Sequence, residues 1–203
     1  IDRAGLADIV ATCERLGVTL ISDEIYHGLD YRAPSVSALE LTKNAIIINS
    51  FSKYYCMTGW RIGWMVLPEY LVRRGEILQQ NLFISAPTLS QIAATVALGE
   101  RDYAEEQKSG YASNRLRLDA GLRELGFDVG GPSDGAFYAY VGISRFSNDA
   151  MAFCARMLEE AGVAMTPGVD FDRVGGQGYV RLSYAGSAAT IALALERMSD
   201  LLR

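Results

Sequence analysis

The sequence predicts an α/β fold, in which a mainly parallel sheet with helices is followed by a smaller α+β unit. In the first part, short apolar runs alternate with amphipathic stretches, which is typical of buried strands between helices. After Gly126 the strand-like stretches carry alternating residues, as in an antiparallel sheet packed on helices. The chain has 203 residues, of which 50% are hydrophobic, so it is long enough to bury a core.

Helices and strands alternate in the first half of the chain. Apolar residues at helical spacing predict a helix over residues 1–16, ended at Gly17. Pro68 and Pro87 each open a further helix at its first turn. Short apolar runs predict three buried strands, at 18–22, 45–50 and 62–67.

A long, charged, periodic stretch at 102–126 predicts a connecting helix. It separates two predicted domains, part of a large one at 1–101 and a small α+β domain at 127–203. Strand-like and helical segments alternate in the small domain, over 135–143, 148–162, 178–185 and 187–202.

Composition excludes several classes of function. With 19 basic and 24 acidic residues, the formal charge is −5, and no basic stripe is present to bind nucleic acid. The first residues lack the apolar core of a signal peptide, and no later stretch is long and apolar enough to span a bilayer. Three scattered cysteines do not make a disulfide framework or a zinc site. We therefore expect a cytoplasmic protein with neither nucleic acid nor membrane as a partner.

The chain has one histidine, His27. This excludes most Ser-His-Asp, Cys-His and multi-histidine metal schemes, and no metal site is expected. His27 itself is interpreted as a surface or loop imidazole beside Tyr26.

The strongest chemical signal is Lys53, just past the end of the strand predicted at 45–50. Open α/β sheets place ligands at this edge. The amine of a lysine can condense with an aldehyde if it is neutral, which takes desolvation or a neighbouring cation. Arg61 could be that cation, although binding an anion suits it better. The hydroxyls of Ser50 and Ser52 and the fork of Arg61 form a donor set suited to a phosphate.

Each of these residues alone also has an ordinary interpretation, as a solvated lysine, a surface ion-pair member or a turn former. Their combination in S-F-S-K-Y-Y-C-M-T-G-W-R-I-G, at 50–63, resembles the lysine signature of class I and II aminotransferases, the fold-type I pyridoxal-phosphate enzymes. The resemblance implies that Lys53 forms a Schiff base with pyridoxal 5′-phosphate and that Ser50, Ser52 and Arg61 bind this cofactor. Cys56 stands where the family has a very small or aliphatic residue, and we expect it to be tolerated.

A second segment, V-T-L-I-S-D-E-I-Y at 18–26, is similar to a strand end of the same family. The resemblance implies that Asp23 lies against the pyridine nitrogen and keeps it protonated, so that the ring acts as an electron sink. Tyr26 would donate its hydroxyl to the phenolic oxygen of the cofactor. Without the family, Asp23 and Glu24 read as an acidic pair at a helix N-terminus.

A third segment, G-Y-V-R-L-S-Y-A at 178–185, resembles the small-domain strand whose arginine binds the α-carboxylate of the amino acid. Arg181 is the candidate, because a guanidinium fork suits a planar carboxylate. Without the family, an arginine in an alternating strand faces solvent. Residues 135–138 and 167–168 match a G-x-F-Y strand and a P-G turn of the family, and we interpret both as structural.

The resemblance covers essentially the whole chain, as the C-terminal part of the large cofactor-binding domain followed by the small domain. It implies an aminotransferase that moves an amino group between an amino acid and a 2-oxo acid, and a homodimer in the intact protein. Parts of the family pattern are absent from the sequence, namely the N-terminal arm, the loop that donates amides to the phosphate, the aromatic residue that stacks on the ring and the N-P-x-G motif.

Three alternatives stay open. The cofactor also serves lyases and synthases on the same fold. The chain could instead be the sensing domain of a transcriptional regulator that retains this fold. Finally, a fragment could bind nothing, because half of the pocket is missing and the sites of the family are completed across a dimer interface.

Overall fold

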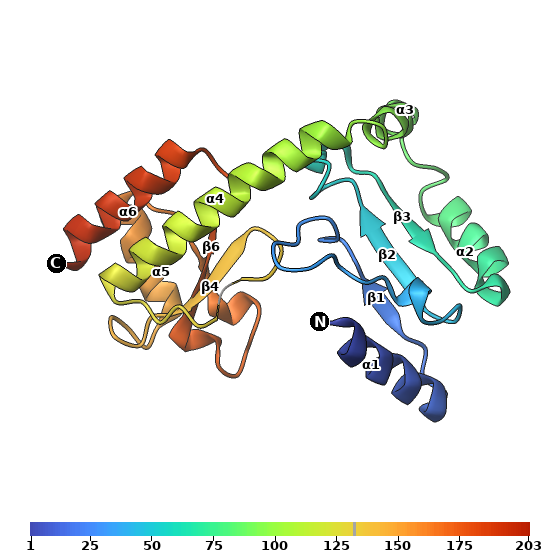
Figure 1. Ribbon diagram of the computed structural model, residues 1–203, viewed down its shortest axis with the longest axis horizontal. Coiled ribbons are helices and arrows are strands. Elements are labelled where there is room, and N and C mark those ends of the chain that lie inside the picture. The colour runs from blue at the N-terminus through green and yellow to red at the C-terminus, as the bar shows by residue number, and fades with distance from the viewer. Residues whose placement is uncertain (132) are drawn as a thin grey trace. The chain divides into compact units, whose positions relative to one another are not determined.

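The computed structural model describes residues 1–131 and 133–203, which form two compact units, Ile1–Glu105 and Glu106–Arg203 (Figure 1). The division falls inside one continuous helix, α4 (Arg101–Leu125). A helix is therefore present where the periodic stretch at 102–126 predicts one. The domain boundaries at 101 and 127 stay a prediction.

The first helix, α1 (Arg3–Leu16), begins and ends at the residues that its sequence favours. The side chain of Asp2 accepts a hydrogen bond from the backbone N–H of Gly5 at 2.8 Å, which caps the N-terminus. Gly17 adopts a left-handed conformation, with φ 63°, and its N–H donates to carbonyls in the last turn of the helix. The predicted helix and its glycine stop are confirmed.

The sheet of the first unit has three strands in the order β1 (Ile21–Asp23), β2 (Ile46–Ser50) and β3 (Gly63–Val66) (Figure 1). β1 and β2 are parallel, whereas β3 is antiparallel to β2. The α/β class is confirmed, and β3 is the antiparallel member among these three strands. The cause is the connection at 51–62, which contains only the short helix η2 (Thr58–Trp60), so the chain returns beside β2 in the opposite direction.

Burial of the three strands differs from the prediction. Ile47 in β2 is 2% exposed and packs in a core cluster with Leu6 of α1 and with Ala38 of η1 (Ala38–Glu40). All four residues of β3 are exposed, and so are both ends of β1. The expectation of a buried strand at 62–67 is therefore wrong, and that at 18–22 is wrong in part. Both strands are edges of the sheet and have one neighbouring strand each.

Two helices follow the sheet, α2 (Glu69–Leu82) and α3 (Thr88–Ala97), and they begin directly after Pro68 and Pro87, as predicted. α3 supports the loop that follows β2. Its Ala94 packs against Phe51 and Met57, and the Ser90 hydroxyl donates to the carbonyl of Trp60 at 2.7 Å.

The second unit holds an antiparallel sheet in the order β4 (Tyr138–Gly142), β6 (Tyr179–Ser183) and β5 (Thr166–Pro167). Its helices are α5 (Ala150–Ala161) and α6 (Ala188–Leu202), and two short helices, η3 (Gly168–Asp170) and η4 (Gly176–Gly178), lie between β5 and β6. Val141, Met157, Val180 and Met198 are fully buried. The predicted small unit with an antiparallel sheet is present.

The P-G turn at 167–168 has a steric cause. A Cβ on Gly168 would lie 2.5 Å from the carbonyl oxygen of Gly176, closer than two such atoms approach, so only glycine fits there. Among the described residues, no helix is both long and apolar enough to cross a membrane.

Candidate active site

Lys53 lies in a tight loop directly after β2. The N–H of Phe51 donates to the carbonyl of Ile62, that of Met57 to the carbonyl of Phe51, and that of Cys56 to the carbonyl of Lys53, over 3.0–3.2 Å. The lysine side chain is half-buried, and its Nζ lies 5.8 Å from the ring centroid of Tyr26. The loop therefore holds the amine beside another predicted site residue.

The two predicted serines lie on the β2 side of Lys53. Ser50 Oγ is 2.9 Å from Ser52 Oγ and 3.0 Å from the carbonyl oxygen of Ile62. Ser50 Oγ is the donor in both contacts, so its one proton is shared between Ser52 Oγ and the carbonyl of Ile62. Ser52 Oγ accepts from Ser50 and can donate its own proton to a bound anion, and the Ser52 carbonyl accepts from Thr58 Oγ1 at 2.6 Å. The two hydroxyls are thus not equivalent.

Arg61 lies close to the same strand end. Gly63, two residues later, pairs with Ser50 in the sheet. Arg61 has a left-handed backbone, with φ 51°, its side chain is exposed, and its Nη1 donates to the carbonyl of Thr58 at 2.9 Å. This contact fixes one end of the fork and orients the guanidinium at the loop that carries Lys53.

Asp23 and Tyr26 belong to the neighbouring strand end. Asp23 is opposite Ile48 in the parallel pair, so the carboxyl ends of β1 and β2 meet at one edge of the sheet. The Asp23 carboxylate is exposed and accepts from the N–H of Ile25 at 3.1 Å. The fold thus brings all predicted cofactor residues to this edge, namely Asp23, Tyr26, Ser50, Ser52, Lys53 and Arg61.

Glu24 has a role that the sequence did not show. It is 4% exposed, and its Oε1 accepts from the N–H of Ala38 at 2.8 Å and from the hydroxyls of Ser37 and Ser22 at 3.1 and 3.2 Å. The residues after β1 form a turn, so the interpretation as an acidic pair at a helix N-terminus is wrong. Glu24 instead connects the end of β1 to residues 37–38 through hydrogen bonds.

His27 lies in this same turn, with its side chain 31% exposed and its Nδ1 3.3 Å from Glu24 Oε2. The interpretation as a loop imidazole is confirmed.

Arg181 lies in the central strand of the second unit. Val180 and Leu182 point into the core, and Arg181 is on the other face, where it is half-buried. Its guanidinium carbon is 4.2 Å from the ring centroids of both Tyr138 and Phe171. A guanidinium between two rings is held in a fixed direction by cation–π contacts, unlike the solvent-facing arginine that alternation alone predicts.

The residues at the sheet edge suit a phosphate-bearing aldehyde. An amine, hydroxyls and a guanidinium follow one another in the loop after β2, and a carboxylate and a phenol lie at the adjacent strand end. The amine can bond to the aldehyde carbon, and the hydroxyls and guanidinium can donate to a phosphate. No group of three or more His, Cys, Asp and Glu residues that could hold a metal ion occurs in the described part of the chain.

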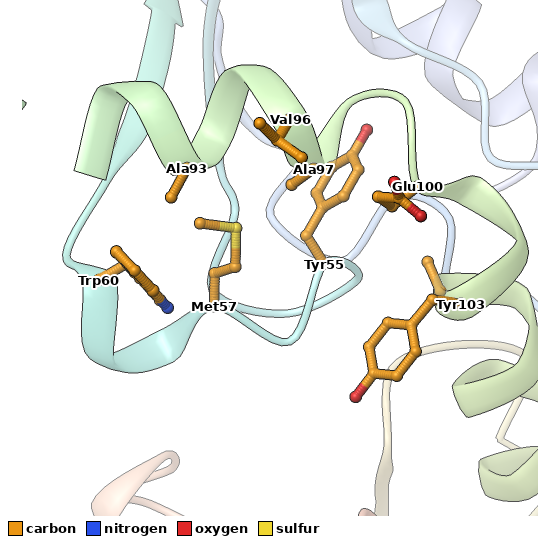
Figure 2. Close-up of a pocket in the computed structure, with 9 residues that line it drawn as sticks. Tyr55, Met57, Trp60, Ala93, Val96, Ala97, Glu100 and Tyr103 are labelled. Atoms are coloured by element: carbon orange, nitrogen blue, oxygen red, sulfur yellow. The ribbon is translucent and has the colours of Figure 1, made fainter. Parts of the chain in front are cut away.

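A cavity of about 250 Å³ lies between the segment after Lys53 and helix α3. Figure 2 shows Met57 and Trp60 on one side and Ala93 of α3 on the other, with Tyr55 and Glu100 farther along. Neither Lys53 nor any other predicted cofactor residue lines this cavity, so it is distinct from the sheet edge.

The aminotransferase class I and II family matches residues 1–198 of the chain. A valine–pyruvate aminotransferase from Mycobacterium tuberculosis is 47% identical over 199 residues, which are 96% of this chain and 51% of that protein. A (5-formylfuran-3-yl)methyl phosphate transaminase from Methanocaldococcus jannaschii is 41% identical over 90% of this chain and 50% of its own length.

Solved structures show the same similarity. The crystal structure of an aminotransferase from Mycobacterium tuberculosis superimposes with a TM-score of 0.95 at 46% identity, over 100% of this chain and 53% of that one. An aromatic aminotransferase from Pyrococcus horikoshii gives a TM-score of 0.91 at 32% identity, over 100% of this chain and 56% of its own. The chain therefore spans about half the length of the relatives that it matches.

Proposed function

The chain belongs to the class I and II aminotransferase family, and on that premise we propose that it carries the lysine and much of the cofactor site of a pyridoxal-phosphate-dependent aminotransferase. Members of this family use pyridoxal 5′-phosphate. The observation that carries the proposal is the half-buried Lys53 at a sheet edge that also holds a carboxylate, a phenol, two hydroxyls and a guanidinium.

Each residue at this edge other than Lys53 has one proposed task toward the cofactor. Ser52 and Arg61 donate to its phosphate, and Ser50 holds Ser52 in place while donating to Ile62. Asp23 would accept a hydrogen bond from the protonated pyridine nitrogen, and Tyr26 would donate to the phenolic oxygen. The bound cofactor supplies an electron sink that stabilises negative charge at the α-carbon of the substrate.

Lys53 has two tasks. Its Nζ would hold the cofactor through the aldehyde carbon, with loss of water. Once an amino acid has taken its place there, the same Nζ would be a base close to the substrate and would move the proton of the α-carbon. The bound cofactor would carry the amino group between an amino acid and a 2-oxo acid.

Arg181 is the proposed partner of the substrate α-carboxylate. Its guanidinium is oriented by Tyr138 and Phe171, and a bidentate pair with a carboxylate requires such an orientation. The substrates are therefore an amino acid and a 2-oxo acid. The names of the relatives support transamination over elimination on this fold.

We further propose a cytoplasmic homodimer as the working form of the intact protein. The three cysteines include no disulfide, which fits a reducing compartment. Relatives about twice as long as this chain support a requirement for further residues in a complete site.

The test is a spectrum of the purified protein with added pyridoxal phosphate, followed by borohydride reduction and peptide mass spectrometry. We expect an absorbance band from a bond between the cofactor and Lys53, and a reduced adduct on the peptide that contains Lys53. Lys53→Ala should lose both, whereas Lys43→Ala, at an exposed loop lysine, should keep both.

The same measurement should be made on a longer version of the protein that spans the full length of the family. An adduct only in the longer version would mean that residues outside this chain complete the site. No adduct in either version would contradict the proposed function.

A further inference from the structure

Tyr54 follows Lys53 directly, and its ring packs against a glycine. A Cβ on Gly28 would lie 2.6 Å from Cδ2 of Tyr54, and Gly28 has φ +92°, so both the space and the backbone require glycine. Gly28 comes two residues after Tyr26, in the same turn, where the N–H of Leu29 donates to the carbonyl of Tyr26. Tyr54 therefore joins the loop of Lys53 to the turn of Tyr26.

The hydroxyl of Tyr54 makes a second connection. It donates to Glu105 Oε1 at 2.6 Å, in the short range of hydrogen bonds to a carboxylate. Glu105 lies in the second turn of α4. Burial and the Glu105 carboxylate raise the pKa of Tyr54 to about 12, so the phenol keeps its proton and can donate at neutral pH.

On the other side of Lys53, the loop is already held. Ser52 is 7% exposed, its N–H donates to Ser50 Oγ at 3.0 Å, and its carbonyl accepts from Thr58. Lys53 thus lies between two fixed neighbours, Ser52 on the side of β2 and Tyr54 on the side of α4.

We infer that Tyr54 is a positioning residue for Lys53, with its ring against Gly28 and its hydroxyl on Glu105 setting the direction in which the amine leaves the loop. The importance of that direction rests on the proposed function, because an amine that bonds to a bound aldehyde must approach the carbon from one side. The positioning itself can be measured without cofactor.

The experiment is competitive acylation of the protein without cofactor, using a small amount of acetic anhydride. Peptide mass spectrometry gives the acylation rate of Lys53 relative to that of Lys43, the exposed loop lysine. Tyr54→Phe keeps the ring and removes the hydroxyl, so the loop should loosen while the packing on Gly28 remains. We expect the Lys53 to Lys43 ratio to rise about fivefold, as for the loss of one hydrogen bond.

Two further variants make the test specific. Glu105→Gln keeps a hydrogen-bond acceptor without the charge, so its Lys53 to Lys43 ratio should lie between those of the wild type and Tyr54→Phe. Tyr70→Phe removes the hydroxyl of an exposed tyrosine on α2 and should leave the ratio unchanged. With pyridoxal phosphate present, the initial rate of borohydride-stable adduct formation at Lys53 should fall in Tyr54→Phe by a similar factor.

An unchanged acylation ratio in Tyr54→Phe would overturn the inference. This includes the case in which the acylation rates of Lys53 and Lys43 rise equally and the melting temperature falls, because such a result indicates a general loss of structure. If the wild type forms no borohydride-stable adduct, the proposed function fails, and the acylation ratio still decides the role of Tyr54.

Discussion

The two charged side chains at the centre of the proposal are held by opposite means. Lys53 lies in a loop held mainly by hydrogen bonds among neighbours in the sequence, from Ser50 to Ile62, to which Tyr54 adds one long-range bond to Glu105. Arg181 lies in the middle of a strand and is fixed by the faces of two rings from distant segments, Tyr138 and Phe171. Hydrogen bonds hold the loop of Lys53 only while each donor keeps its proton, whereas the two rings hold the plane of the Arg181 guanidinium without a proton of their own.

If Arg181 binds the substrate and not the cofactor, its removal should affect the two differently. Arg181→Leu should raise the KM for the amino acid about 100-fold, since a hydrogen-bonded charge pair is lost, and should leave cofactor affinity near that of the wild type. Steady-state kinetics and a cofactor titration give both quantities. Arg181→Lys should fall between, because it keeps the charge and loses the fork. An unchanged KM would remove Arg181 from the substrate site.

This difference also explains how much the sequence could show. The loop of Lys53 is contiguous, so its donors stand together at 50–61 and could be found by their types and spacing. For Arg181, the resemblance supplied the residue, but Phe171 had no signal in the sequence, because the contact depends on how the segment between β5 and β6 folds back. Glu24 was missed for the same reason, since its partners Ser37 and Ala38 lie 13 and 14 residues away.

The exposed strands could not be predicted either. An apolar run such as that at 62–67 shows that a strand forms, but its burial depends on which segments cover it. β3 is an edge strand whose residues are all exposed, and Trp64 and Met65 are 38% and 51% exposed. Composition alone cannot distinguish such a strand from a central one.

Within the hydrogen-bonded loop, substitutions of the two serines, Ser50 and Ser52, should have different effects. Ser52→Ala removes the proposed phosphate donor and should weaken pyridoxal phosphate binding about tenfold. Ser50→Ala removes the donor to the Ile62 carbonyl, so it should lower the melting temperature more than Ser52→Ala does. Cofactor titration and thermal unfolding of both variants make the comparison. Equal effects of the two substitutions on both measurements would contradict the assignment.

The ring contact on Arg181 should have a smaller effect. Phe171→Leu keeps apolar volume and removes one aromatic face, so the KM for the amino acid should rise about threefold with kcat nearly constant. Val174→Ala, three residues away and 97% exposed, is the matched control and should have no effect. A Phe171→Leu enzyme with the KM of the wild type would show that the strand alone orients Arg181.

The smallest effect concerns pH, and it should be confined to the loop of Lys53. The pKa of Tyr54 is raised from 10.0 to about 12, first by burial and then by the hydrogen bond and charge of Glu105. Tyr55 also raises this pKa, whereas Arg101 opposes the shift by lowering it. A folded-state pKa above the ordinary value means that the folded protein holds this proton more tightly. The stabilisation is therefore present in full below pH 10 and lost as the pH rises toward 12.

The near-ultraviolet absorbance of tyrosinate should show this directly. The difference between the alkaline titrations of the wild type and Tyr54→Phe should have its midpoint near pH 12, and Glu105→Gln should move that midpoint toward 10. Phe171 has no proton to lose, so its contact with Arg181 should persist over the same range. A Tyr54 that titrates near its ordinary pKa would show that the bond to Glu105 does not form in solution, and the loop of Lys53 would then be fixed only from the side of β2.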